Sequence, residues 1–325
     1  MRCILNDSQD PYINLATEEY LLKNSDEEIF MLWRCYPSVI IGKHQNTLAE
    51  INYSWVKENR IRVARRITGG GTVYHDSGNI NFTFIRNGRQ GHLVNYPGQL
   101  EPVIEILNNL GINAIMGKKN EILLKGRKIS GNAEHIYKSR ILHHGTLLFD
   151  ADLEMLKQAI KVTPRKYTDK AVKSIRSDVT NIRFHASRNL STEKFMNRLF
   201  ESFVFKNADN DIYSLSPSES SMISLLTFEK YNTWEWIYGY SPGYRFENTI
   251  DLDDRHIIIK LDVKNGRIIS AILDGNFFTG RQAQTLTESL IHQKHAESSI
   301  NTLVNTVLGK NAAPDYIQKI TDAFF

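Results

Sequence analysis

Residues 79–84 read NINFTF, and this stretch indicates the fold more clearly than any other part of the chain. Ile80, Phe82 and Phe84 alternate with polar residues, and a period of two is the spacing of side chains along a β-strand. A strand with one apolar and one polar face belongs to a sheet that has its core on one side only. We therefore expect a half-buried strand here, as the starting point of a larger sheet.

Strand-like runs continue on both sides of this stretch. Short β-rich runs precede it, and further runs follow a helix that ends at Gly111. The strands expected are residues 29–34, 39–42, 112–116, 121–124, 128–136 and 141–150. The helices expected are residues 11–23, 97–110, 152–161, 191–205 and 216–231. Because strands and helices follow one another without a sustained strand–helix–strand alternation, the predicted fold class is α+β, with a mixed β-sheet flanked by helices.

A second, smaller domain is expected toward the end of the chain. The aromatic segment 234–246 is rich in turn residues and separates the preceding helices from a new pattern. Two apolar runs then flank Asn265-Gly266, which is the strongest short signal for a β-hairpin. With the helices that follow, these residues predict a small α+β domain. The two domains are placed at residues 1–247 and 248–325.

Composition excludes several classes of protein. The chain has 325 residues, 41% of them apolar and 23% charged, which is a globular balance. Its 40 basic and 36 acidic residues leave a net charge of +4 that is not gathered into a tail, so nothing favours nucleic acid. No run approaches the roughly 18 apolar residues of a membrane span, and no signal-peptide core follows the N-terminus. Two cysteines are too few for a disulfide framework, and we expect a cytoplasmic protein.

Residues 65–79 read RRITGGGTVYHDSGN and form the first of two segments that carry chemistry. Three successive glycines let the backbone approach a ligand closely and expose amide donors that can hold an anion. The segment is neither a phosphate loop nor a dinucleotide fingerprint, since the glycine spacing differs and no Gly-Lys-Ser/Thr follows. A glycine-rich turn in a twisted sheet is the alternative explanation. The arginines before the glycines, with His75 and Asp76 after them, favour a bound ligand, because unpaired polar groups are costly inside a fold.

The second segment covers GRKISGNA at 126–133 and continues to HHGTLL at 143–148. A hairpin turn leads into a strand in which Lys128 lies on a polar face. A solvated outer face would also explain this polarity. His143 and His144 point to opposite faces of a strand, so at most one of them faces a given site. No further ligand lies at the spacing of a structural zinc site, and we therefore discount zinc.

Together, these two segments closely resemble the signatures of lipoate–protein ligases. The similarity extends to the opening helix at 14–19, to Trp33, to the turn at 41–46 and to the aromatic segment 234–246. It spans most of residues 11–247, and the remaining residues resemble, more loosely, the accessory domain of the longer bacterial ligases. The resemblance implies the biotin and lipoate ligase fold.

Members of that family activate lipoic acid with ATP to lipoyl-adenylate, release pyrophosphate, and pass the lipoyl group to a lysine of an acceptor protein. The resemblance therefore implies ATP as a substrate and Mg²⁺ as the ion that bridges its phosphates. The implied partners are lipoate, the lipoyl domains of 2-oxo acid dehydrogenase complexes, and the glycine-cleavage H protein. The metal ligands are not assigned, although Asp76 is a candidate.

The resemblance also implies site residues. Lys128 matches the family lysine that contacts the adenylate phosphate, and it is the expected catalytic residue. Cations at Lys128 and Arg66 would stabilise the charge that develops when a carboxylate attacks the α-phosphate. The residues expected to bind ATP or the adenylate are Arg66, Gly71, Thr72, Val73, Tyr74 and Lys128. The residues expected to bind lipoate are Trp33, Arg65, Gly70, His75 and His144.

Two further features bear on this assignment. The apolar face of the strand at 79–84 is another candidate for the slot that takes the lipoyl chain. Lys43 stands where the family usually has an arginine, and lysine cannot reproduce a bidentate guanidinium contact. Lys43 is therefore left out of the expected site.

Other functions stay open at this point. An octanoyl or lipoyl transferase of the same fold would use no ATP and would require an activated thiolate, for which Cys35 is a better candidate than Cys3. A transfer-only enzyme would take preformed lipoyl-nucleotide from another enzyme. A biotin ligase fits less well because its Gly-Arg-Gly-Arg loop is absent. A non-enzymatic adenylate-binding or nucleic-acid-binding module is disfavoured because the basic residues do not form a concentrated patch.

Overall fold

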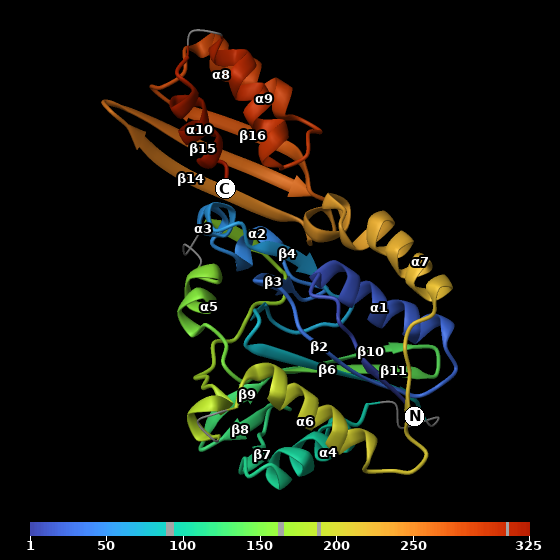
Figure 1. The fold of residues 1–325 in the computed structure, drawn as a ribbon. Helices are drawn as coiled ribbons and strands as arrows, with labels where there is room; N and C mark the ends of the chain where they lie inside the picture. Colours follow the sequence, from blue (N-terminus) through green and yellow to red (C-terminus); the bar gives the residue numbers. More distant parts are fainter. Residues whose placement is uncertain (89–93, 162–165, 187–189, 310–311) are drawn as a thin grey trace. The chain divides into compact units, whose positions relative to one another are not determined.

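The computed structural model describes residues 1–88, 94–161, 166–186, 190–309 and 312–325 (Figure 1). The chain forms two compact units, and neither is continuous in sequence. The first consists of residues 1–43, 62–157 and 174–233, and the second of residues 44–61, 158–173 and 234–325. Each unit is built around its own principal sheet and its own apolar core.

A six-stranded mixed sheet forms the centre of the first unit. Its strands, in spatial order, are β10 (Asn132–Tyr137), β11 (Arg140–Leu148), β6 (Asn79–Asn87), β2 (Ile29–Trp33), β1 (Arg2–Leu5) and β13 (Asp211–Ile212). β1 pairs in parallel with both of its neighbours, whereas the pairs from β2 to β10 are antiparallel. The mixed sheet and its flanking helices confirm the predicted α+β fold class.

Helices cover both faces of this sheet (Figure 1). α1 (Pro11–Asn24) begins after Asp10, whose side chain caps the first turn, and packs against β6 and β11 on one face. α6 (Thr192–Val204) packs against β1 and β6 on the other face, next to α4 (Tyr96–Asn109). The apolar residues of α4 and α6 share one core with the phenylalanines of β6.

The helix predicted over residues 216–231 is α7 (Pro217–Leu226) followed by a π-helical turn, η2 (Thr227–Tyr231). Both pack along α1. Glu19 of α1 is buried and accepts a hydrogen bond from the Tyr231 hydroxyl at 2.5 Å, which ties η2 to the helix. Among the helices of the described residues, none is both long enough and apolar enough to cross a membrane.

β6 differs from the half-buried strand that its alternation predicts. Its apolar residues belong to the core with α4 and α6, but its polar residues are buried as well. Those buried polar residues are Asn79, Asn81 and Thr83. β6 is a central strand between β2 and β11, and α1 packs against it. The prediction of a half-buried strand is therefore wrong, and its apolar face belongs to the core instead of forming a slot for a ligand.

Two three-stranded sheets complete the strand structure of the first unit. The first has the order β4 (Arg62–Arg65), β3 (Ser38–Ile41) and β5 (Val73–His75). The second has the order β7 (Ala114–Met116), β8 (Ile122–Leu124) and β9 (Arg127–Ser130). The three glycines therefore connect two strands of one sheet. Gly131 separates β9 from β10, so the single strand predicted over 128–136 is two strands in different sheets.

The second unit contains a four-stranded sheet. Its strands are β12 (Tyr167–Asp169), β14 (Tyr244–Leu252), β15 (Arg255–Lys264) and β16 (Arg267–Gly275). Asn265 and Gly266 have φ angles of 51° and 68° and form the turn between β15 and β16, so the predicted hairpin is confirmed. β14 continues across residue 247, where the sequence analysis places the boundary between the two domains. The domain limits therefore stay a prediction.

Helices pack around the cores of both units. In the first unit, a short 3₁₀ turn, η1 (Ile182–His185), follows β12 in the chain. The division of the chain after residue 157 falls within α5 (Leu153–Ala159). The helices of the second unit are α2 (Thr47–Glu50), α3 (Tyr53–Glu58), η3 (Glu235–Gly239), α8 (Gly280–Leu290), α9 (Glu297–Leu308) and α10 (Pro314–Asp322).

Candidate active site

The turn of three glycines lies between β4 and β5 in the first unit. Gly70 has a φ angle of +88°, a left-handed conformation that favours glycine. A Cβ atom at Gly70 would also lie 3.1 Å from the Nη2 atom of Arg66, whereas a Cβ atom at Gly69 would meet nothing within 4 Å. The turn therefore requires glycine at its second position.

Arg66 holds this turn from inside the protein. Its Nη2 donates to the carbonyl oxygens of Gly69 and Gly71, at 2.7 Å each. Its Nη1 donates to the carbonyl of Ile40 at 3.1 Å, and its Nε donates to Thr68 Oγ1 at 2.9 Å. Burial lowers the pKa of the guanidinium to about 10, so Arg66 stays charged at neutral pH. Arg66 is thus a buried cation that fixes the shape of the turn.

β5 continues from the turn with further residues predicted to bind the nucleotide. The N–H of Thr72 donates to Ser174 Oγ at 2.9 Å, and a Cβ atom at Gly71 would lie 3.2 Å from Ser174. Val73 is half-buried, and Tyr74 is buried. Burial raises the pKa of the Tyr74 hydroxyl. Ser174 therefore holds the far end of the turn, and the sequence motifs do not predict this contact.

Trp33 and His75 lie side by side, and both are buried. Their ring centroids are 5.8 Å apart in an edge-to-face arrangement. Burial, together with the neighbouring Arg66 and His144, lowers the pKa of His75 to about 3, so its ring is neutral at neutral pH. The Nε2 atom of His75 is buried and has no hydrogen-bond partner within the described residues. This ring therefore offers one hydrogen-bonding atom to a ligand.

His144 belongs to a buried polar cluster. Its Nδ1 lies 3.0 Å from each carboxylate oxygen of Glu18, and its Nε2 lies 2.8 Å from Thr68 Oγ1. Thr68 is also the acceptor for Nε of Arg66. The structure thus joins a residue predicted for lipoate to a residue predicted for the nucleotide. His143 instead hydrogen-bonds to Glu134, with its Nδ1 2.9 Å from Oε1, and takes no part in this cluster.

Lys128 lies on β9, and a neighbouring segment holds its backbone. Its N–H donates to the carbonyl of Asp178 at 2.9 Å, and its carbonyl accepts from the N–H of Thr180 at 3.0 Å. The side chain is half-buried, and burial lowers the pKa of its ammonium group. A Cβ atom at Gly131 would lie 3.3 Å from Lys128 Nζ. Glu121 and Lys119 lie near enough to act on this charge in opposite directions, but within the described residues Lys128 forms no ion pair.

Arg65 lies at the end of β4 and is buried. Its Nη1 donates to the carbonyl oxygens of Gly42, at 3.0 Å, and Lys43, at 2.9 Å. Arg65 therefore ties the turn after β3 to the sheet. Its contact with lipoate stays a prediction.

Asp76, the carboxylate considered as a metal ligand, accepts hydrogen bonds from the backbone around it. Its Oδ1 accepts from the N–H groups of Gly78 and Asn79, and its Oδ2 accepts from the N–H of Asp152. In the part of the chain that the structure describes, no group of three or more His, Cys, Asp or Glu side chains could hold a metal ion.

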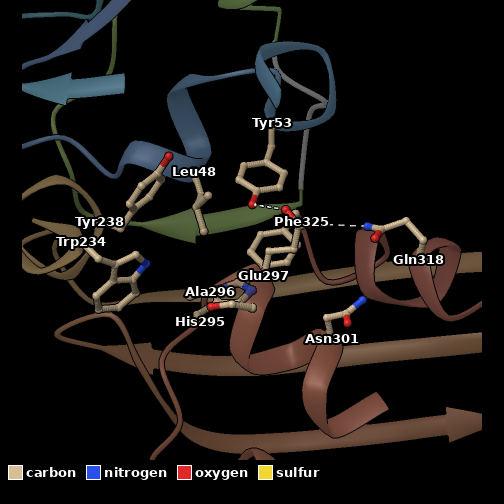
Figure 2. A pocket seen from close by; sticks show the side chains of 11 residues that line it. Leu48, Tyr53, Trp234, Tyr238, His295, Ala296, Glu297, Asn301, Gln318 and Phe325 are labelled. Atoms are coloured by element: carbon tan, nitrogen blue, oxygen red, sulfur yellow. Dashed lines mark hydrogen bonds between the residues drawn. The ribbon is translucent and has the colours of Figure 1, made fainter. Parts of the chain in front are cut away.

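A cavity of about 550 Å³ lies in the second unit (Figure 2). Aromatic rings form much of its wall, and the Tyr53 hydroxyl donates to Glu297 at 3.1 Å. Gln318 donates to the same carboxylate and Lys57 pairs with it, so the charge of Glu297 is neutralised within the unit. None of the residues predicted for the site lines this cavity.

Sequence reasoning missed three buried polar residues of the candidate site: Glu18, Thr68 and Thr83. The Thr83 hydroxyl donates to Glu18 Oε1 at 2.5 Å and accepts from Trp33 Nε1 at 3.0 Å. For Thr83, the signal was present in the polar positions of residues 79–84. A polar strand face predicts solvent contact, but here that face carries the hydrogen bonds of the site.

Comparison with known proteins places the chain in a family. Residues 10–204 match the model of the lipoyl protein ligase A/B catalytic domain, which covers more than half of the chain. The chain belongs to the lipoate–protein ligase family. Residues 241–324 match the bacterial lipoate protein ligase C-terminus. The resemblance inferred from the two glycine-containing segments is thereby confirmed.

Individual relatives of this lipoate–protein ligase agree with that assignment. The chain is 38% identical over 292 residues to lipoate–protein ligase 1 of Staphylococcus aureus, covering 89% of both chains. A putative lipoate protein ligase from T. acidophilum with bound lipoic acid has a TM-score of 0.63 and 28% identity, over 73% of this chain and 98% of that one. A lipoate-protein ligase A bound with ATP has a TM-score of 0.61 and 28% identity, over 74% of this chain and 98% of that one.

Proposed function

We propose that this lipoate–protein ligase joins lipoate to a specific lysine of an acceptor protein in two steps. In the first, the lipoate carboxylate attacks the α-phosphorus of ATP, forming lipoyl-AMP and releasing pyrophosphate. In the second, the lysine amine of the acceptor attacks the acyl carbon of the mixed anhydride, forming an amide and releasing AMP. The observation that carries the proposal is the continuity of the site, in which Thr68 joins His144 to Arg66 and so to the glycine turn.

The nucleotide is proposed to bind at the glycine turn and Lys128. Attack of a carboxylate on a phosphate brings anions together, so fixed cations and backbone amides lower the barrier when they face the developing charge. Lys128 is the direct contact, because it is a half-buried cation without an ion-pair partner among the described residues. Arg66 contributes the field of a buried charge and holds the carbonyls of Gly69 and Gly71. Thr72, Val73 and Tyr74 would line the nucleotide on β5.

The lipoyl chain is proposed to lie against Trp33, His75 and His144, with Arg65 and Gly70 at its carboxylate end. An eight-carbon chain with a dithiolane ring needs an apolar wall, which the buried Trp33 ring supplies. The neutral His75 adds one hydrogen-bonding atom without adding charge. A site of this kind would hold the chain while leaving its carboxylate to the cations.

The second step requires no nucleophile on the enzyme, because the mixed anhydride is already reactive toward a lysine amine. The task of the protein is then to position the two reactants and to exclude water. Burial raises the pKa of Cys3 to about 11 and that of Cys35 to about 12, so neither thiol is ionised at neutral pH. This supports the ligase over a transferase of the same fold that forms a thioester on cysteine.

Finer details complete the proposal. Mg²⁺ enters as the ion of the ATP substrate. The acceptors are lipoyl domains, including those of 2-oxo acid dehydrogenase complexes, and the glycine-cleavage H protein. The proposed compartment is the cytoplasm, because both cysteines are free thiols, as is usual in a reducing compartment.

Mass spectrometry of an acceptor domain tests the whole reaction. Purified chain, lipoate, ATP and Mg²⁺ should add one lipoyl group to a purified lipoyl domain and none to the same domain with its target lysine replaced by arginine. Omission of ATP should abolish the modification, and synthetic lipoyl-AMP should restore it. Modification without ATP from an octanoyl or lipoyl donor protein would contradict the proposal in favour of the transferase.

A further inference from the structure

An unbroken chain of buried hydrogen bonds leads from the glycine turn to helix α1. A guanidinium group can only donate, so Nε of Arg66 donates to Thr68 Oγ1 at 2.9 Å. The hydroxyl proton of Thr68 is then free for Nε2 of His144, at 2.8 Å. Nδ1 of the same ring carries a proton that points to Glu18, at 3.0 Å, because a carboxylate can only accept.

A second chain reaches Glu18 from the other side. An indole nitrogen also can only donate, so Nε1 of Trp33 donates to Thr83 Oγ1 at 3.0 Å. The Thr83 hydroxyl donates in turn to Glu18 Oε1 at 2.5 Å. Both chains start at donor-only groups. Glu18 is the common end point and must accept from both.

The need to accept hydrogen bonds from both chains explains why residue 18 is a glutamate. The side chain of Glu18 is 1% exposed, and burying a carboxylate is costly unless hydrogen bonds compensate for its lost hydration. Within the described residues, its hydrogen bonds go to Thr83 and His144 alone. An amide in its place would present an NH₂ group to one of two donors. A glutamine whose oxygen accepts from Thr83 therefore presents its NH₂ group to His144 Nδ1, in place of the Oε2 atom that lies 3.0 Å from that nitrogen.

We propose that Glu18 is a positioning residue that acts through His144 and Thr68 on Arg66, and thereby on the shape of the glycine turn. The hydroxyls of Thr68 and Thr83 link the members of these hydrogen-bond chains. Glu18 holds Trp33 and His144 on the side proposed for lipoate, and Arg66 on the side proposed for the nucleotide. The proposal rests on the proposed function for the identity of these two ligands, but the hydrogen-bond order is a property of the protein alone.

The proton position on His144 tests the order of the chain directly. Glu18→Gln should turn an NH₂ group toward Nδ1, so that the ring proton moves to Nε2. Nitrogen-15 NMR of the histidine-labelled full chain distinguishes the two tautomers. The Nδ1-protonated form is expected in the wild type and the Nε2-protonated form in Glu18→Gln. The same tautomer in both proteins would overturn the proposal.

Substitutions at Thr68 test the action on the turn. Thr68→Val keeps the shape of the side chain but removes the hydroxyl, whereas Thr68→Ser keeps the hydroxyl. In lipoate-dependent exchange of pyrophosphate into ATP, we expect Thr68→Val and Glu18→Gln to raise the KM for ATP about tenfold, the loss of one good hydrogen bond. Thr68→Ser should stay within about threefold of the wild type. Equal impairment of Thr68→Ser and Thr68→Val, or an unchanged KM in Glu18→Gln, would contradict the proposal.

Thr17→Val is the matched control. Thr17 lies next to Glu18 on α1, is fully buried, and donates its hydroxyl to the carbonyl of Ile13 at 2.8 Å. The Thr17→Val variant thus loses a buried threonine hydroxyl, as Thr68→Val does, but one that lies outside the chain of hydrogen bonds. The KM of Thr17→Val for ATP should match that of the wild type, even if its thermal unfolding temperature falls as far as that of Thr68→Val.

Amide hydrogen exchange separates failure of this proposal from failure of the proposed function. Exchange at residues 69–72, measured by mass spectrometry without ligands, should be faster in Thr68→Val and Glu18→Gln than in Thr17→Val. If the wild type catalyses no pyrophosphate exchange but these amides respond as expected, the proposed function fails and the positioning device stands. If the enzyme is active but neither the amides nor the KM respond, the positioning proposal fails alone.

Discussion

Thr68 Oγ1 and His144 Nε2 lie 2.8 Å apart, although 76 residues separate them in the sequence. Thr68 belongs to the segment with three glycines, and His144 belongs to the HHGTLL segment on β11. The two segments that carry the family resemblance are therefore two walls of one site. This contact makes the arrangement of the site testable through single substitutions on either wall.

Lys128→Ala should abolish formation of the adenylate. Loss of a fixed cation that faces developing phosphoryl charge is expected to slow lipoate-dependent pyrophosphate exchange by about 100-fold or more. Lys128→Arg keeps the charge with different geometry and should retain partial activity. Thermal unfolding serves as the control, because Lys128 makes no ion pair within the described residues and its loss should leave the fold intact. Wild-type exchange in Lys128→Ala would contradict its assignment as the catalytic residue.

Gly70→Ala and Gly69→Ala form a matched pair within one turn. At Gly70 an alanine must adopt φ near +88° and places its Cβ 3.1 Å from Arg66, whereas at Gly69 the Cβ meets nothing within 4 Å. A left-handed alanine costs about 1 kcal/mol, so Gly70→Ala should raise the KM for ATP about fivefold. Gly69→Ala should leave it unchanged. Steady-state kinetics at saturating lipoate decide, and equal effects of the two substitutions would argue against the turn as the nucleotide site.

Replacement of the cysteines should leave both reactions in place. Cys3→Ala and Cys35→Ala remove thiols whose pKa values burial raises to about 11 and about 12. Because neither thiol is ionised at neutral pH, lipoylation of a lipoyl domain with ATP should proceed at a similar rate in the double variant. A modest loss of stability, about 1 kcal/mol per buried thiol, is expected from lost packing. Loss of transfer in a folded Cys35→Ala variant would instead favour a thioester mechanism.

His75 should make the protein more stable as the pH rises through the weakly acidic range. Its pKa is about 3 in the folded protein and 6.5 in the reference state, so between these values the unfolded chain binds the extra proton. The free energy of unfolding therefore increases with pH in this window. His75→Asn should reduce that slope by up to about 1.4 kcal/mol per pH unit between about pH 5 and 6.5. Urea unfolding at several pH values measures it, and an unchanged slope would mean that His75 is not buried as a neutral ring.

Local signals in the sequence predicted much of the secondary structure. The helix expected over 11–23 is Pro11–Asn24, because Asp10 and Pro11 define its start within one turn. Asn265-Gly266 likewise defines the hairpin through backbone angles that these two residues readily adopt. The family signatures each lie within a short stretch of chain as well, and the ligand contacts that they imply stay a prediction.

What the sequence could not supply depends on neighbours distant along the chain. The polar face of β6 is buried because β2, β11 and α1 surround it, and no alternation pattern records that environment. Glu18 enters the site because Thr83 and His144 meet it from two other strands. Gly131 divides a predicted strand because the residues on its two sides pair in different sheets. Each of these features is a relation between segments, not a property of one segment.

The most direct test of the central claim is lipoate-dependent exchange of labelled pyrophosphate into ATP. The assay uses purified full chain with Mg²⁺ and no acceptor protein, so that it reports the first step alone. The account predicts exchange that requires lipoate and falls to background in Lys128→Ala. No exchange from folded wild-type protein would contradict ATP-dependent activation of lipoate. Transfer from synthetic lipoyl-AMP by that same preparation would then assign the chain to the second step only.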